Sequence, residues 1–230
     1  MSSLKYHNLN TTFFDLGVFL NNFSMIASGQ WQSLFLSHIQ PFGLFWAIPF
    51  YFLSTDWAAT IILTCQAGFL VLPVIGLYRH FGIIPALAFS IYFPLWYNAL
   101  FDFHIDHLAI PILFGFFFFE RKGKLPHAIF LAVLLALVKE PFALQTVFCG
   151  LYLFLARKNY LAGLLLILFG MVYFSACTEY IQYYFNSPYI SITGGWDAVS
   201  HNKAFGWLGS SKQEIILFLI TNPHTVLLEI

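Results

Sequence analysis

Long apolar runs are the feature that most restricts how this chain can fold. A segment of about 20 apolar residues crosses the hydrocarbon core of a bilayer. Four runs reach or approach that length: residues 57–78, 83–100, 105–119 and 160–180. Hydrophobic residues make up 60% of the 230 positions and charged residues only 9%, whereas soluble globular proteins carry about 25% charged residues. A soluble enzyme is therefore excluded.

These runs predict an all-α fold, a polytopic transmembrane helical bundle forming one domain over residues 1–230. The lipid bilayer is then the first partner, and a prokaryotic plasma membrane is the expected location. The formal net charge is zero, so no basic field attracts nucleic acid. The three cysteines, Cys65, Cys149 and Cys177, lie in apolar runs without a CxxC motif, which disfavours a disulfide framework or a zinc site.

The basic residues predict how the spans are oriented, because short clusters of Lys and Arg favour the cytoplasmic side. They form three clusters: Arg79 with His80, then Arg121, Lys122 and Lys124, then Arg157 and Lys158. If all three are cytoplasmic, the apolar stretch 125–156 cannot be one straight helix. It must form a hairpin that bends at Lys139, Glu140 and Pro141, where the proline disfavours a continuous helix.

The same orientation places residues 11–40 in an outer juxtamembrane segment and residues 186–214 in an outer loop. Residues 38–53 then form a short juxtamembrane or re-entrant piece, which suits their length and prolines. The alternative, a full span at 38–53, would invert the topology of everything after it.

Ionisable groups at membrane depth are costly unless they are paired or hydrated, so those on the outer side are functional candidates. They are Asp15, His38, Asp102, His104, Asp106, His107, Lys139 and Glu140. In a helix Asp102 and Asp106 share one face, and in an extended chain they share a side with His104. Either geometry could bind a divalent cation, a candidate cofactor, or orient a catalytic base.

Each candidate also has a purely structural interpretation. The run from Asp102 to His107 could be a hydrated interfacial loop. Lys139 and Glu140 could form a local ion pair that caps two helix ends at the bend, whereas in the functional interpretation Lys139 holds a phosphate or carboxylate. Asp15 could cap an interfacial helix.

The segment FDLGVF, residues 14–19, resembles the FDLGIF signature of a prokaryotic family of uncharacterised, predicted polytopic membrane proteins. Further matches follow in family order: His38-Ile39-Gln40-Pro41, Pro49, Tyr51, Gln66, Pro73, Phe101-Asp102-Phe103-His104, Pro111 and Lys139-Glu140. That family is similar to the membrane glycosyltransferases with the C-type fold, such as the protein mannosyltransferases and the aminoarabinose transferases.

The resemblance implies part of that fold and transfer of a sugar from a polyprenyl-phosphate donor at the outer face. Asp15 would be the catalytic base or a metal-side carboxylate, and Asp102 its partner. Lys139 would hold the lipid phosphate, and the other substrate-binding candidates are His38, His104 and Glu140. Asp102 and Asp106 are the candidate metal ligands.

Two departures from the family pattern affect this expectation. Pro141 stands where the closer family has an acidic residue, although it matches the proline of the transferases' Lys-Gly-Pro turn. Only fourteen residues precede Asp15, and the chain stops at Ile230, so we expect it to lack the family's first helix and distal half. The alternatives to an enzyme are a transporter with an ion or proton pathway, and a non-catalytic membrane subunit.

Overall fold

The computed structural model describes residues 15–35, 38–101, 103–181, 184–185, 207–208 and 212–225. The chain divides into two compact units, Met1–Tyr183 and Tyr184–Ile230. Regular structure in the described residues is helical, which confirms the all-α prediction. The first unit holds α2 (Asp15–Ala27), α3 (Gly43–Ala47), α4 (Thr55–Phe81), α5 (Ile83–Ser90), α6 (Phe93–Phe101), α7 (Ala109–Arg121), α8 (Leu125–Val138), α9 (Phe142–Leu151) and α10 (Tyr160–Ser175). In the second unit, α13 (Lys212–Thr221) packs Phe218 edge-on against Trp207.

Two helices among the described residues are long and apolar enough to cross a membrane, Thr55–Phe81 and Tyr160–Thr178. They coincide with the predicted spans at 57–78 and 160–180. The first is α4, which ends at Phe81 and is followed by Gly82, whose φ of 89° only a residue without Cβ adopts readily. The second is α10, which continues into a π-helical turn at Ala176–Ile181.

The other two predicted spans are not single long helices. The run 83–100 breaks between α5 and α6, because Pro94 has no amide hydrogen for a continuing helix and instead lies in the first turn of α6. The run 105–119 begins as a 3-10 turn, Ile105–Leu108, before α7. Pro111 cannot donate to the carbonyl of His107, so it too belongs in a first turn. The 13 residues of α7 are about 20 Å long.

The predicted hairpin at 125–156 is confirmed. Helix α8 ends at Val138, Lys139 is extended with φ of −165° and ψ of 148°, and α9 follows Pro141. The segment 38–53 is likewise not a full span, as predicted, since it contains only the five residues of α3 and a 3-10 turn, Ile48–Tyr51.

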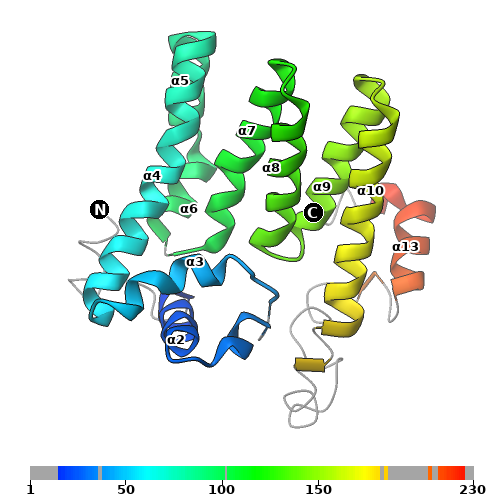
Figure 1. The fold of residues 1–230 in the computed structure, drawn as a ribbon. Coiled ribbons are helices and arrows are strands. Elements are labelled where there is room, and N and C mark those ends of the chain that lie inside the picture. Colours follow the sequence, from blue (N-terminus) through cyan, green and yellow to red (C-terminus); the bar gives the residue numbers. More distant parts are fainter. Residues whose placement is uncertain are drawn as a thin grey trace. The chain divides into compact units, whose positions relative to one another are not determined.

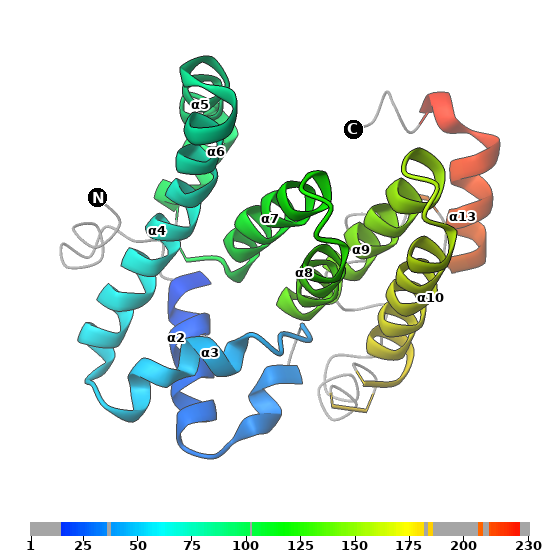
Figure 2. The ribbon, with the colours of Figure 1, turned by 45° about the horizontal axis from the view of Figure 1, so that its top comes forward.

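Within the first unit, α7, α8, α9 and α10 run in alternating directions, so their connections fall at two ends (Figure 1, Figure 2). The turns after α4, α7 and α9 carry the three basic clusters and share one end. Contacts there join them, because the His80 ring lies 4.7 Å from that of Phe118 and Arg157 pairs with Glu120. We call residues 79–82, 120–124 and 157–159 the basic end. The predicted common side of the basic clusters is thus confirmed.

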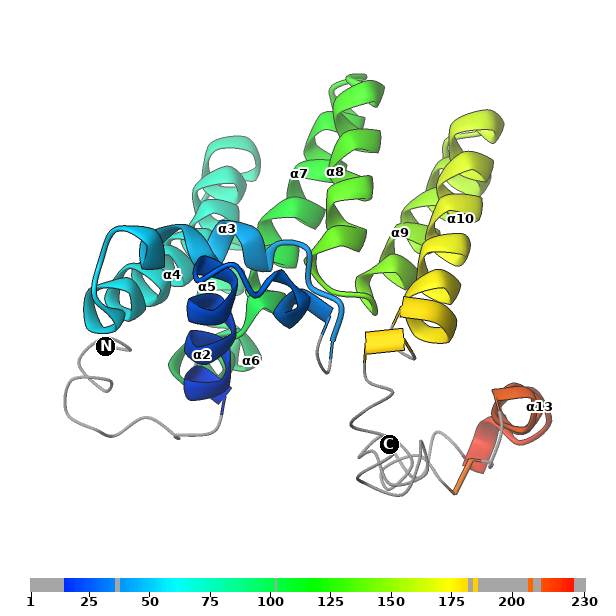
Figure 3. The same ribbon diagram turned by 60° about the horizontal axis from the view of Figure 1, so that its bottom comes forward.

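The opposite end, which we call the polar end, contains His38–Gln40, residues 103–107 and residues 139–141. Helices α2 and α3 lie there (Figure 3). The ring of Phe103 is fully buried and meets Phe19 and Phe23 of α2 and Trp46 of α3 at centroid distances of 5.3, 5.8 and 5.0 Å. This aromatic cluster fixes the backbone of residues 103–107 against α2 and α3.

Packing between α9 and α10 depends on small residues. A Cβ atom on Gly163 would come within 2.7 Å of the Gly150 carbonyl oxygen and of the Phe154 amide nitrogen. The face of α10 that does not pack against α9 carries large exposed side chains, with Leu161 71% exposed and Val172 67% exposed. Small residues inside and large apolar residues outside are typical of helices that face lipid.

Candidate functional site at the polar end of the bundle

Glu140 joins the hairpin tip to the segment before α3. Its Oε1 lies 2.6 Å from Nδ1 of His38, and its Oε2 accepts a hydrogen bond of 2.9 Å from the backbone amide of Ile39. In return the Glu140 amide donates to the Ile39 carbonyl at 3.2 Å. Glu140 is only 4% exposed, so its carboxylate is buried with both oxygens hydrogen-bonded, which is what a buried charge requires.

Lys139 points to a different carboxylate. Its Nζ lies 3.4 Å from Oδ1 of Asp106, in the 3-10 turn before α7, and His104 Nδ1 lies 3.7 Å from Oδ2. Burial of Asp106 opposes ionisation, but the hydrogen bond with His104 and the positive charge of Lys139 outweigh it and lower the pKa of Asp106. Asp106 is therefore a carboxylate near neutral pH.

Gln66 orients the start of this turn from the middle of α4. It is 2% exposed, and its Oε1 accepts a hydrogen bond of 3.0 Å from the backbone amide of His104. The bond crosses from α4 to the polar turn, so it fixes the height at which His104 and Asp106 lie along α4.

His107 is buried next to these groups and stays neutral. Its Nδ1 is 2.9 Å from the His104 carbonyl oxygen, and this contact requires the proton on Nδ1. Burial lowers the pKa of His107. Nε2 is then an acceptor, and it has no hydrogen-bond partner among the described residues. A buried acceptor without a partner favours a site that takes up a donor from a ligand.

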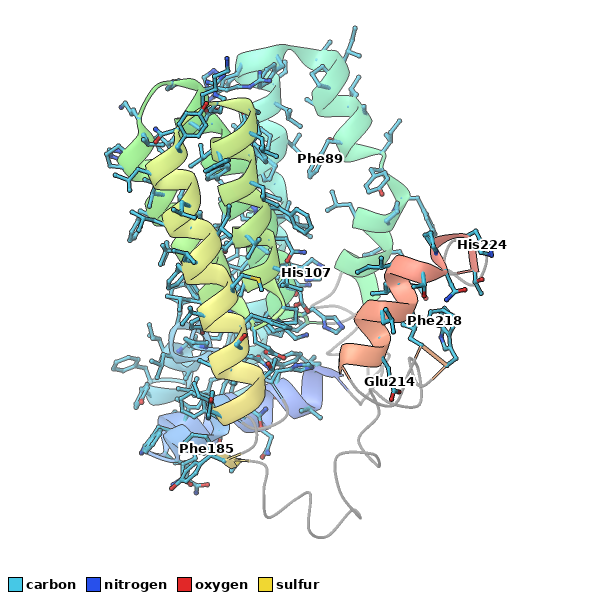
Figure 4. All side chains as sticks on the ribbon, turned by 90° about the vertical axis from the view of Figure 1, so that its right-hand side faces the viewer. Phe89, His107, Phe185, Glu214, Phe218 and His224 are labelled. Carbon is cyan, nitrogen blue, oxygen red and sulfur yellow. The ribbon has the colours of Figure 1, made fainter. Side chains whose placement is uncertain are left out.

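A pocket of about 500 Å³ opens beside this cluster. His104, Asp106 and His107 line one part of it, and Phe89 and Tyr92, from α5 and the break after it, line another. Figure 4 labels His107 and Phe89 of these residues. An apolar and aromatic wall with a few converging polar groups is typical of a small-molecule site.

The structure brings together five of the predicted site residues: His38, His104, Asp106, Lys139 and Glu140. Asp102 and the side chain of Asp15 lie outside the described residues. Asp15 begins α2, one turn before Phe19, whose ring is 6.0 Å from that of His104. The predicted local ion pair between Lys139 and Glu140 is wrong. Lys139 pairs with Asp106, and Glu140 pairs with His38.

No group of three or more His, Cys, Asp or Glu side chains in the described part of the chain has a metal-binding arrangement. The candidate pair of Asp102 and Asp106 lies partly outside that part, so a divalent cation there stays a prediction.

The sequence assigned no specific role to two residues of this region, although Gln66 matches the family pattern and His107 belongs to the charged run. Gln66 carried a signal, since an amide in the middle of an apolar span needs a partner. For His107 the sequence held no such signal, because only the fold shows that its imidazole is the buried one of the two that line the pocket.

The profile of a family described as "Predicted membrane protein (DUF2079)" matches residues 5–230. No curated protein and no solved structure matches the chain. The profile match covers nearly the whole chain and agrees with the two apolar helices long enough to span a bilayer. The chain therefore belongs to this family of predicted membrane proteins of unknown function.

Proposed function

We propose that the protein is glycosyltransferase-like and uses a polyprenyl-phosphate-linked sugar at the outer membrane face. The observation that supports this most directly is the meeting of His38, Asp106, Lys139 and Glu140 at the end opposite the basic clusters, beside an aromatic pocket. Charged groups gathered at the end of a bilayer protein are costly unless they serve a hydrated or substrate-bound site.

In the proposed reaction an acceptor hydroxyl oxygen attacks the anomeric carbon of the donor sugar. The bond from that carbon to the phosphate oxygen breaks, the lipid phosphate leaves, and the hydroxyl proton passes to a carboxylate. Asp15 is the proposed base, with Asp102 as its partner. Lys139 would offset the charge on the departing phosphate.

The geometry of Lys139 suits that role. Its ammonium lies 3.4 Å from one Asp106 oxygen and is partly exposed, so a phosphate bearing more charge than a carboxylate can compete for it. Asp106 would meanwhile keep its contact with His104. His38 and Glu140 hold the hairpin tip that presents Lys139.

The pocket supports sugar binding. His107 Nε2 is an acceptor without a described partner, and a sugar hydroxyl is a donor. The rings of Phe89 and Tyr92 on the same pocket provide apolar surface for the carbon face of a sugar ring.

The alternative of a transporter or proton pathway needs a polar route between the polar end and the basic end. Most described side chains buried between these ends are apolar, including Ile112, Phe116, Ala132 and Leu135. The buried amide of Gln66 is used in its bond to the His104 backbone. The buried hydroxyl of Thr146 is bonded to the Ala132 carbonyl at 2.7 Å. These residues favour a site confined to one end. A non-catalytic subunit would tolerate alanine at the polar positions.

The first test uses the full chain in proteoliposomes with a radiolabelled polyprenyl-phosphate hexose and follows loss of label from the lipid fraction. We expect release by the wild type, and about 100-fold slower release by Lys139→Gln, in the range for loss of one charge-stabilising group. Lys124→Gln, at the basic end, is the control and should match the wild type. Absence of release with any donor, or equal rates for both variants, would reject the proposal.

A further inference from the structure

A second pocket lies at the basic end. Its volume is about 680 Å³. Leu77 of α4 with Phe114 and Phe117 of α7 form its apolar part, and His80, Arg121 and Lys122 also line it. Nothing in the proposed transfer reaction uses these residues, which lie at the opposite end from Lys139.

The basic side chains of this pocket are held by aromatic rings. The Arg121 guanidinium carbon lies 5.5 Å from the centre of the Phe81 ring, and Lys122 Nζ lies 4.3 Å from that of Phe118. The His80 ring packs on the same Phe118 ring at 4.7 Å. Cation–π contacts position a positive charge without neutralising it, so both cations remain able to bind an anion.

The carboxylate adjacent in sequence, that of Glu120, does not pair with these cations. Glu120 is buried, pairs with Nε of Arg157, and accepts a hydrogen bond of 3.0 Å from the Tyr152 hydroxyl. Among the described residues no carboxylate forms an ion pair with Arg121 or Lys122. The pocket therefore combines an apolar interior with a positively charged edge.

We propose that this pocket binds an anionic phospholipid of the cytoplasmic leaflet. Its phosphate lies between Arg121 and Lys122, and one acyl chain enters among Leu77, Phe114 and Phe117. The occupant must carry both an anion and a hydrocarbon chain, because the pocket offers both surfaces. Basic pockets between helices at the cytoplasmic side are suited to anionic headgroups, and basic clusters favour that side.

The test measures lipid binding to the purified full chain by native mass spectrometry, with titrations of dioleoyl phosphatidylglycerol and dioleoyl phosphatidylcholine. We expect tighter binding of phosphatidylglycerol. The double variant Arg121→Gln/Lys122→Gln should weaken that binding about 10- to 30-fold, as expected for loss of two charges near the membrane surface, and leave phosphatidylcholine unchanged.

The matched control is Arg79→Gln/Lys124→Gln, which removes two charges from the same end but from outside the pocket. It should change phosphatidylglycerol binding less than twofold. Leu77→Trp fills the apolar part, keeps the charges, and should also weaken binding. All four substituted basic positions are exposed, so the charge comparison does not depend on whether Leu77→Trp folds.

Three outcomes would overturn the proposal. Equal affinity for the two lipids would remove the anionic preference. Equal losses of phosphatidylglycerol affinity in the two double variants would show that the preference comes from the general surface charge of this end and not from the pocket. Displacement of phosphatidylglycerol by glycerol phosphate at matched concentration would show a site for a free anion rather than for a lipid. Because the pocket lies at the opposite end, failure here leaves the proposed transfer reaction untouched.

Discussion

At the scale of single residues, substitution of Glu140 should lower the stability of the fold. The buried Ile39 amide depends on its Oε2, and an amide left buried without an acceptor costs about 1–3 kcal/mol. We therefore expect Glu140→Ala to lower the free energy of unfolding in detergent by that amount, and Glu140→Gln, which keeps an oxygen acceptor, to lower it less. Lys124→Ala is the exposed control. Unfolding midpoints unchanged by Glu140→Ala would contradict this account of the hairpin tip.

Asp106 should make stability depend on acid pH. Its pKa is below the ordinary value of 3.8 when folded, so the unfolded chain takes up its proton first as the pH falls. The stabilisation from Lys139 and His104 is therefore complete above that ordinary value and is lost as the pH falls through the lowered pKa. Wild type and Asp106→Asn should differ in unfolding midpoint at neutral pH and converge in strong acid. A difference that persists in strong acid would point to a cause other than charge.

The residue pairs show how far sequence reasoning reached. The cost of burying charge predicted that His38, Asp106, Lys139 and Glu140 would lie together, and they do. The partners were not predictable, because Lys139 and Glu140 are adjacent in sequence but the extended backbone at Lys139 turns them to different elements. The buried state of His107 likewise depends on the three-dimensional packing alone.

At the scale of elements, the contact between α9 and α10 should be sensitive to a single methyl group. We expect Gly163→Ala to destabilise the chain by about 1–3 kcal/mol, since the new Cβ would meet backbone atoms of α9 that cannot move independently. Gly68→Ala is the matched control, because nothing lies within 4 Å of its added Cβ. Thermal unfolding in detergent measures both. A Gly163→Ala midpoint equal to that of Gly68→Ala would show that the two helices can separate slightly at no cost.

The helices were predictable where the length of an apolar run decides their bounds, and less predictable where a proline decides where a helix begins. α4 and α10 follow from uninterrupted apolar sequence, and the hairpin from charge in the middle of a run. The missing amide hydrogen of proline does not by itself predict a break, because Pro73 lies inside α4 without ending it, whereas Pro94 and Pro111 lie in the first turns of α6 and α7. Their positions within apolar runs made the hydrophobic signal misleading there.

At the scale of the whole molecule, the opposite placement of the basic and polar ends predicts a labelling pattern. With the native cysteines replaced, Lys124→Cys and Asn159→Cys should react with an impermeant maleimide only in inverted vesicles. Ser54→Cys, at the other end of α4, should react only in intact spheroplasts. These positions are exposed or partly exposed and lie in turns or at a helix start. Labelling of Lys124→Cys and Asn159→Cys from different compartments would reject the shared basic end.

The junction between residues 39–42 and 137–140 rests on main-chain atoms as well as on Glu140. The Phe42 amide donates to the Leu137 carbonyl, and the Glu140 amide to that of Ile39. These hydrogen bonds use main-chain atoms only, so they do not depend on which side chains stand at positions 42 and 137, although Phe42 also packs against the core. Proline is the exception at position 42, because it alone would delete the donor.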